Sequence, residues 1–306
     1  MNVRSQKLIT FVLGMLAGIL LVAQFAFKDD DKKTAEEKGN IANAATVYKA
    51  PKLPTQMTLF GEKVPLERQD IREAFDRELI YNNYNQGHML YILKLADRYF
   101  PQIEATLKAN GLPDDFKYLC VAESNLQNLV SKVGASGFWQ FMKTTAPGYN
   151  LDVNESVDER YHVQKSTEAA CKYLKTAYAK FGNWTAAAAS YNCGMGGYNG
   201  QATFQKTMNY YDLLLPEETN KYIFRILAFK HIMSNAKEMG FELNKNDLYG
   251  NYPTKSVKVD KSITNLVQWA ADNGTNYKMV KKLNPWIRGR TLVVKPGKTY
   301  EVKLPS

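Results

Sequence analysis

Apolar residues recur three or four positions apart through the middle of the chain, which is the spacing of one helix face. The segments that show this spacing, and that we expect to be helices, are 67–79, 89–100, 112–126, 166–181 and 217–233. Among the residues on their apolar faces are Ile71, Phe75, Leu79, Leu90, Leu93, Ala96, Ala170, Leu174, Ala177, Tyr222, Ile226 and Phe229. Ile103 and Leu107 continue the apolar pattern of the second segment after Pro101, Ser166 is expected to cap the fourth segment, and Gly182 is expected to end that segment. The pattern therefore predicts a mainly α fold.

Residues 252–306 follow a different pattern. Short runs that are typical of strands occur at 257–259, 292–294 and 300–304, with two short helical segments between the first two runs. Tyr252 and Pro253 mark the start of this region. We therefore expect a second, smaller domain of short strands around two helices.

One stretch near the N-terminus is apolar on every side. Residues 8–27 carry no charge, and these 20 residues are long enough to cross a bilayer core of ~30 Å as a helix. Arg4 and Lys7 precede the stretch and Asp29 follows it closely, which keeps the N-terminus in the cytoplasm by the positive-inside rule. We expect residues 1–28 to be a transmembrane anchor, with a cleaved signal peptide as the alternative.

Residues 29–55 alternate charged residues, small residues and prolines. Their few apolar side chains are too little to offset the entropy lost on ordering the chain. We expect a disordered tether that holds a folded part at some distance from the membrane.

The composition fits a globular protein with a basic surface. Hydrophobic residues make up 45% of the 306 residues, which excludes a largely disordered chain, and the length favours about two domains. Forty Lys and Arg against 30 Asp and Glu give a net charge of +10, which favours association with an anionic polymer. Nucleic acid is not expected as that polymer, because no nucleic-acid-binding motif is present and the anchor places the folded part outside the cytoplasm.

A carboxyl group lies on the apolar face of segment 112–126. Phe116, Leu119, Cys120 and Glu123 fall at i, i+3, i+4 and i+7 of one helix face. Burial disfavours the charged form of a carboxyl and raises its pKa, which lets a glutamic acid donate a proton near neutral pH. The pattern permits two interpretations of Glu123: a catalytic acid, or a structural glutamate paired with an Arg or Lys.

Short motifs follow Glu123 in a distinctive order. They are ES at 123–124, SKVGASGFWQF at 131–141, VDER at 157–160, FGNW at 181–184, SYNCG at 190–194 and EET at 217–219. Their order and spacing resemble the lysozyme-like lytic transglycosylases that cleave bacterial peptidoglycan, most closely the membrane-bound murein transglycosylase D type. The resemblance implies a goose-type lysozyme-like domain over residues 56–245, with its catalytic core at about 110–240.

The resemblance also implies a set of site residues. Glu123 matches the only catalytic acid/base of the family. The residues that match positions lining the substrate cleft are Ser131, Ser136, Gln140, Tyr191, Asn192 and Tyr222. No metal or organic cofactor is implied. Cys120 and Cys193 lie beside these motifs, and two alternatives stay open for them, a disulfide or free buried thiols.

The implied chemistry uses a single carboxyl group. Ordinary glycosidases need two carboxylates around the bond, and here only Asp158 and Glu159 are near candidates for a partner. Arg160 follows them directly, which indicates an ion-paired turn. In the family, the glutamic acid protonates the oxygen between N-acetylmuramic acid and N-acetylglucosamine, and the C6 hydroxyl closes a 1,6-anhydro ring without water.

Residues 252–306 resemble a degenerate LysM module, a βααβ unit that binds glycans containing N-acetylglucosamine. The whole chain is thus expected to act on peptidoglycan at the periplasmic face of a bacterial envelope, tethered through residues 8–27. Two alternatives remain: a hydrolytic muramidase on the same fold, with Asp158 or Glu159 as base, and a catalytically silent peptidoglycan-binding anchor.

Overall fold

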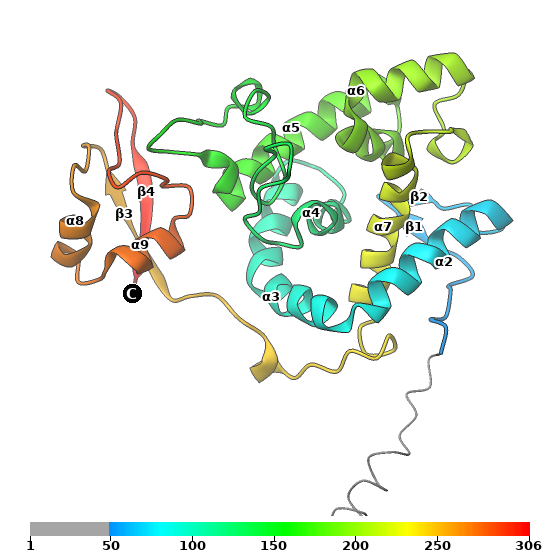
Figure 1. Cartoon of the computed structure of the whole chain (residues 1–306), viewed down its shortest axis with the longest axis horizontal. Coiled ribbons are helices and arrows are strands. Elements are labelled where there is room, and N and C mark those ends of the chain that lie inside the picture. Colours follow the sequence, from blue (N-terminus) through cyan, green and yellow to red (C-terminus); the bar gives the residue numbers. More distant parts are fainter. Residues whose placement is uncertain (1–48) are drawn as a thin grey trace, which may run out of the picture. The chain divides into compact units, whose positions relative to one another are not determined.

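A computed structural model describes residues 49–306 of the chain, and residues 51–306 form one compact unit (Figure 1). The expected anchor at 1–28 and most of the expected tether at 29–55 lie outside the described residues. Within residues 49–306, no helix combines the length and the apolar character needed to cross a membrane.

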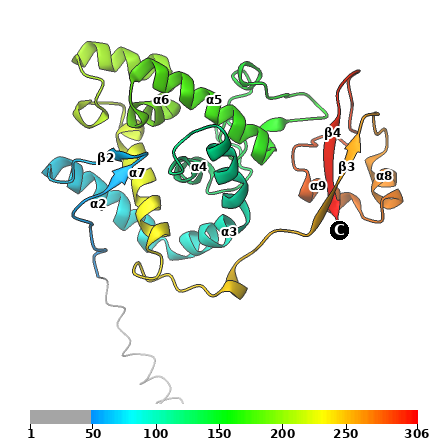
Figure 2. The same ribbon diagram turned by 180° about the vertical axis from the view of Figure 1, so that it is seen from behind.

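Residues 58–234 are mainly helical, which confirms the predicted fold class. The larger helices are α2 (Gln69–Tyr84), α3 (Gln86–Ala109), α4 (Phe116–Ser124), α5 (Val163–Phe181), α6 (Trp184–Gln205) and α7 (Glu217–Ser234). α7 packs against α2, α4 and α6, while α5 packs against α3 and α6. The short helix α4 therefore lies among longer ones, as both ribbon views show (Figures 1 and 2).

One hairpin and four short 3₁₀ helices accompany these helices in the described chain, and the last 3₁₀ helix lies beyond α7. The hairpin joins β1 (Thr58–Leu59) to β2 (Glu62–Lys63), and the 3₁₀ helices are η1 (Ala146–Tyr149), η2 (Glu159–Tyr161), η3 (Tyr210–Asp212) and η4 (Lys245–Asp247). Glu62 accepts hydrogen bonds from the main-chain N–H groups of Trp184 (2.6 Å) and Thr185 (3.0 Å). A carboxylate at this place satisfies donors that the first turn of α6 leaves unpaired.

α3 differs from the expected segment. It is one continuous helix of 24 residues with Pro101 inside it, so the apolar pattern that continues at Ile103 and Leu107 belongs to the same helix. A proline in a helix interior costs ~3 kcal/mol, and the complete burial of Ile103 and Leu107 beyond it offsets this cost. The apolar face is also rotated relative to the prediction, because Met89 and Ile92 are fully buried whereas Leu90 and Leu93 are half-buried.

α5 begins earlier than expected. His162 is its N-cap, since Nδ1 of this residue accepts a hydrogen bond from the N–H of Lys165. The predicted cap, Ser166, lies inside the first turn and donates a hydrogen bond from Oγ to the carbonyl of His162 (2.8 Å). The predicted end at Gly182 is confirmed, with φ +77° at the C-cap.

The C-terminal region forms a small domain with its own core. β3 (Thr254–Val259) pairs antiparallel with β4 (Tyr300–Pro305), and α8 (Leu266–Asp272) and α9 (Tyr277–Leu283) lie between them in sequence. The strand expected at 292–294 is absent from this sheet. Leu292 forms only an isolated bridge with Ile263, and its side chain is fully buried in the core of this domain.

A loop from the helical part enters the C-terminal core. Val157 is fully buried among the apolar residues of the small domain. Its neighbours continue the contact: the N–H of Asp158 donates to the carbonyl of Trp286 (2.8 Å), and the N–H of Arg288 donates to that of Ser156 (2.8 Å). Main-chain hydrogen bonds and shared apolar burial thus join the two parts.

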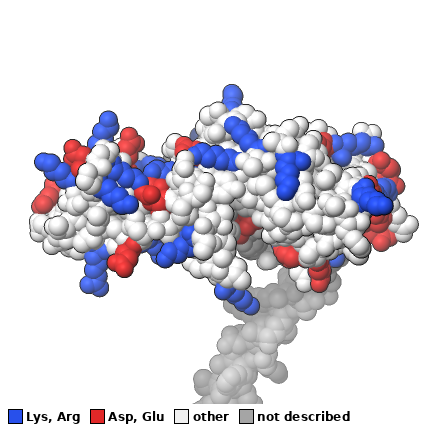
Figure 3. Space-filling view, turned by 90° about the horizontal axis from the view of Figure 1, so that it is seen from above, with Lys and Arg blue, Asp and Glu red and all other residues white. Residues whose placement is uncertain are grey.

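Basic residues are concentrated in the small domain. Residues 255–306 contain 11 Lys and Arg against three Asp and Glu, so they carry +8 of the net +10 of the whole chain. On the face shown in Figure 3, Lys and Arg project at many separate points and are mixed with acidic groups. This distribution indicates a diffuse attraction for anions over this face.

Candidate active site

Glu123 lies at the C-terminal end of α4, one residue before its last residue. Phe116, Leu119 and Cys120 are fully buried on the same helix, which confirms the predicted apolar face. Asn125 follows with φ +54° and ends the helix in the left-handed region. The carboxyl group therefore lies where a buried helix gives way to a loop.

The hydroxyl of Tyr222 on α7 donates a hydrogen bond to Oε1 of Glu123. Burial raises the pKa of Glu123 to about 7, and this effect exceeds the lowering by the Tyr222 hydrogen bond and by the charge of Arg225. Glu123 therefore has the protonation behaviour expected of a general acid near neutral pH. The structural alternative, a glutamate in an ion pair, is not observed for this residue among the described ones.

Tyr191 lies beside this carboxyl group. Its hydroxyl donates to the carbonyl of Trp139 (2.7 Å), and its ring meets those of Phe141 and Tyr173 edge to face at 6.1 and 4.9 Å. Burial raises the pKa of Tyr191 well above its usual value, and the charge of Glu123 raises it further. Tyr191 is thus a neutral hydrogen-bonding group next to the acid.

Asn192 connects two helices. Its Oδ1 accepts a hydrogen bond from Oγ1 of Thr219 at 2.7 Å, which links α6 to the first turn of α7. Two residues later, Gly194 has non-helical angles (φ 77°, ψ 149°) and kinks α6. The Tyr191–Asn192 pair therefore lies at a break in its helix, where side chains are not confined to a regular helix surface.

Ser131, Ser136 and Gln140 lie on a loop after α4, and each bonds to main-chain atoms of that loop. Ser131 Oγ accepts from the N–H of Ala135 (3.0 Å), and Ser136 Oγ donates to the carbonyl of Gly134 (3.3 Å). Gln140 donates from Nε2 to the carbonyls of Gly137 (2.8 Å) and Leu129 (3.2 Å). The structure brings Glu123, Tyr222 and Tyr191 together. The two serines and Gln140 instead stabilise the neighbouring loop.

Arg160 stabilises this loop through hydrogen bonds to its main-chain carbonyls. Its Nη1 donates to the carbonyls of Gly134 (3.1 Å) and Phe141 (3.0 Å), and its main-chain carbonyl lies where a side chain at Gly137 would project. Gly137 has φ +81°, which L residues rarely adopt. Sequence reasoning had linked Arg160 only to its acidic neighbours and missed this contact, because the loop lies about 20 positions away.

The second carboxylates considered from the sequence are engaged in ion pairs. Asp158 accepts from Arg160 Nε (3.0 Å) and Nη2 (2.7 Å), with both side chains buried. Glu159, also buried, pairs with Lys165 and accepts from the N–H of Asp152. The prediction of an ion-paired turn is confirmed, and neither carboxylate is free to bind a water molecule as a base without breaking its pair.

Cys120, Cys171 and Cys193 are free thiols, so of the two alternatives the disulfide does not form. Within residues 49–306, no group of three or more His, Cys, Asp or Glu side chains is arranged to hold a metal ion.

Comparison with known proteins assigns both parts of the chain. The Transglycosylase SLT domain family matches residues 100–213, and the Soluble lytic transglycosylase C-terminal LysM-like domain family matches residues 255–306. Membrane-bound lytic murein transglycosylase D of Escherichia coli K12 is 26% identical over 239 residues, or 74% of this chain. The protein of the same name from Escherichia coli O6:H1 gives the same values.

The chain spans about half the length of these curated relatives, since the match covers 50% of each. Glu123, Gln140 and the Tyr191–Asn192 pair fall inside the SLT match, while Tyr222 lies beyond its last residue. The resemblance predicted from the motifs is confirmed by both matches. This chain carries a transglycosylase SLT domain followed by a LysM-like C-terminal domain and is homologous to the lytic murein transglycosylases.

Proposed function

We propose that this protein is a peptidoglycan lytic transglycosylase. It cleaves the β-1,4 bond between N-acetylmuramic acid and N-acetylglucosamine and forms 1,6-anhydro-N-acetylmuramic acid. The observation that carries the proposal is the carboxyl of Glu123, whose pKa is raised to about 7 by burial and which is hydrogen-bonded by Tyr222. The two domain matches support the same activity.

In the first step, the protonated Glu123 transfers its proton to the glycosidic oxygen, and the bond from this oxygen to C1 breaks. Positive charge develops at C1, and the acetamido group of the same sugar helps to stabilise it. The Tyr222 hydroxyl donates to Glu123 in the structure, so it also stabilises the carboxylate that this step produces.

In the second step, the Glu123 carboxylate acts as a base. It takes the proton of the C6 hydroxyl while the oxygen of that hydroxyl attacks C1 and closes the anhydro ring. The proton lost in the first step is thereby regained, and no water is consumed. One carboxyl suffices for both steps, which fits the engagement of Asp158 and Glu159 in ion pairs.

The remaining predicted site residues have binding roles in this proposal. Tyr191 and Asn192 line the cleavage site at the kink of α6. Ser131, Ser136 and Gln140 form a wall on the loop that Arg160 supports. The LysM-like domain binds the glycan strand, and residues 8–27 tether the protein to the membrane at the periplasmic face of the envelope.

The test is the mass of the products. The full chain, solubilised in detergent, is incubated with purified peptidoglycan beside the Glu123→Gln variant and a control, Glu168→Gln, on the neighbouring helix α5. We expect muropeptides lighter by one water than reducing muropeptides from the native protein and the control, and none from Glu123→Gln. Reducing products would instead indicate a hydrolytic muramidase, and binding without any release would indicate a silent anchor.

A further inference from the structure

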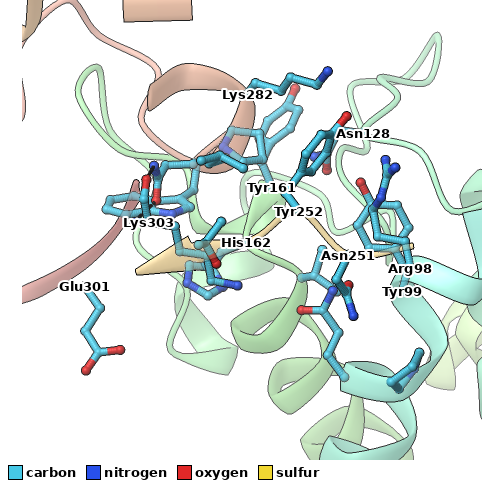
Figure 4. Close-up of a pocket in the computed structure, with 18 residues that line it drawn as sticks. Arg98, Tyr99, Asn128, Tyr161, His162, Asn251, Tyr252, Lys282, Glu301 and Lys303 are labelled. Carbon is cyan, nitrogen blue, oxygen red and sulfur yellow. Dashed lines mark hydrogen bonds between the residues drawn. The ribbon is translucent and has the colours of Figure 1, made fainter. Parts of the chain in front are cut away.

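A cavity of about 350 Å³ lies at the junction of α3, the start of α5 and the C-terminal domain (Figure 4). α3 contributes Arg98 and Tyr99 to its wall, and the C-terminal domain contributes Lys282 and Lys303. Glu123 does not line it. Its size lies in the range of pockets that hold small ligands.

Three cations face this cavity without a carboxylate partner among residues 49–306. Arg98 donates from Nε and Nη2 to the carbonyls of Gly250 (2.7 Å) and Tyr249 (3.1 Å), and neither Lys282 nor Lys303 forms an ion pair. The Arg98 guanidinium and the Lys282 ammonium both lie over the ring of Tyr252, 4.5 and 4.8 Å from its centre. Such a group of unpaired cations favours an anionic ligand.

The one acidic residue of the wall does not neutralise this group. Glu301 lines the cavity on the same side as Lys303 and at the opposite side from Arg98 (Figure 4), so it does not oppose the charge of Arg98. The charge of the lining residues is thus three cations against one carboxylate.

Two further side chains in the wall carry the hydrogen-bonding groups that pair with a peptide, an acceptor and a donor. Oδ1 of Asn128 is shielded from solvent and has no hydrogen-bond partner within the described chain, which is unfavourable for a buried acceptor. A small rotation of this amide would pair it with a ligand N–H. His162 accepts from Lys165 through Nδ1, and burial lowers its pKa to about 4, so the neutral ring carries its proton on Nε2, which can donate to a carbonyl of a ligand.

The cavity shares a loop with the candidate active site. Asn128 stands five positions after Glu123, and the next residue, Leu129, accepts the hydrogen bond of Gln140. The ring of Tyr99 packs edge to face on that of Phe138 at 4.7 Å. The cavity wall is therefore continuous with the loop that follows the acid.

We propose that this cavity binds a carboxylate-bearing peptide, namely a stem peptide of the peptidoglycan strand whose glycan bond lies at Glu123. The unpaired cations bind the peptide carboxylates, while Asn128 and His162 bind its main-chain groups. The identity of the polymer rests on the proposed function. The +8 charge of residues 255–306 favours approach of the same anionic strand.

The test measures equilibrium binding in a Glu123→Gln background, so that no strand is cleaved. The full chain is titrated with purified glycan strands that carry stem peptides and with the same strands after an amidase has removed the peptides. The cavity variant is Lys282→Gln/Lys303→Gln. The control is Lys278→Gln/Lys295→Gln, which removes the same charge at exposed positions of the same domain that do not line the cavity.

We expect the cavity variant to bind peptide-bearing strands about tenfold more weakly and stripped strands within about twofold of the parent protein. The control should lose no more than about twofold on either strand. An equal loss on both kinds of strand would overturn the inference, because the lysines would then contact the glycan. The inference would also be overturned if the parent protein bound strands with and without peptides equally tightly.

A competition experiment separates this inference from the proposed function. A free acidic stem tripeptide should compete with peptide-bearing strands for the parent protein and compete at least fivefold less well for the cavity variant. This readout does not depend on cleavage. If the tripeptide competes while the product test shows no anhydro sugars, the cavity assignment stands and the catalytic proposal fails.

Discussion

The hydroxyl of Tyr222 and the carboxyl of Glu123 are joined by a hydrogen bond across 99 positions of the chain. Packing of α4 against α7 makes this contact. Tyr222 is buried and Glu123 is half-buried, and the pKa of Glu123 depends on burial, on this hydrogen bond and on the charges of Arg225 and Glu218.

Replacing Tyr222 with phenylalanine should shift the pH profile of cleavage. The hydrogen bond lowers the pKa of Glu123, so its loss raises this pKa and moves the fall of activity to higher pH by about one unit. The measurement is kcat/KM from pH 4 to 9. Tyr198→Phe is the control, because the Tyr198 hydroxyl donates to the carbonyl of Met208 instead. An unchanged midpoint in Tyr222→Phe would show that the hydrogen bond does not set the protonation of Glu123.

The raised pKa of Glu123 should also appear in the stability of the protein. Its value rises from 4.5 to about 7 on folding, so the folded state holds the proton more tightly. The stabilisation is complete below pH 4.5 and is lost as the pH rises through 7. Glu123→Gln removes this dependence. We expect the variant to gain about 3 kcal/mol over the native protein between pH 4 and pH 8, measured by urea unfolding at both values; a constant difference would mean that the carboxyl titrates normally.

Two glycines of the cleft loop should respond differently to alanine. Gly134 and Gly137 both have positive φ, but a side chain has free space at Gly134 and would overlap the carbonyl of Arg160 at Gly137. We expect Gly134→Ala to lower the free energy of unfolding by about 1 kcal/mol and Gly137→Ala by at least about 3 kcal/mol. Denaturant titration measures both. Equal losses would contradict the close approach of Arg160 to the loop.

Asp158→Asn should destabilise the protein without changing the type of product. It leaves the guanidinium of Arg160 buried beside a neutral amide, which costs about 3–5 kcal/mol. Glu67→Gln, which breaks an exposed pair with Lys63, should leave the free energy of unfolding unchanged within the error of the measurement. Anhydro products should persist at temperatures where Asp158→Asn is folded. Their replacement by reducing sugars, or their loss from a fully folded variant, would give Asp158 a part in catalysis.

The positions of single helices show which structural features the local sequence pattern predicts and which it does not. The face of α2 was predicted residue by residue, because Ile71, Phe75 and Leu79 each need only the helical repeat to meet one core. The start of α5 was misplaced at Ser166, because a serine and a histidine can both cap a helix and only the path of the preceding loop selects between them. Ile103 and Leu107 continue the apolar pattern of α3 past Pro101 in the sequence, but only the packing of both residues shows that the helix runs on without a break.

The sequence alone specified the mainly helical fold, the separate C-terminal domain and the identity of Glu123 as the unusual carboxyl. Each of these depends on short-range spacing or on motifs in a fixed order. Tertiary structure alone decided the bond between Tyr222 and Glu123, the contact of Arg160 with the cleft loop, and the cavity that Arg98 shares with Lys282. These pairs are far apart in the chain, and burial and hydrogen-bond geometry between them arise only when helices and domain pack together.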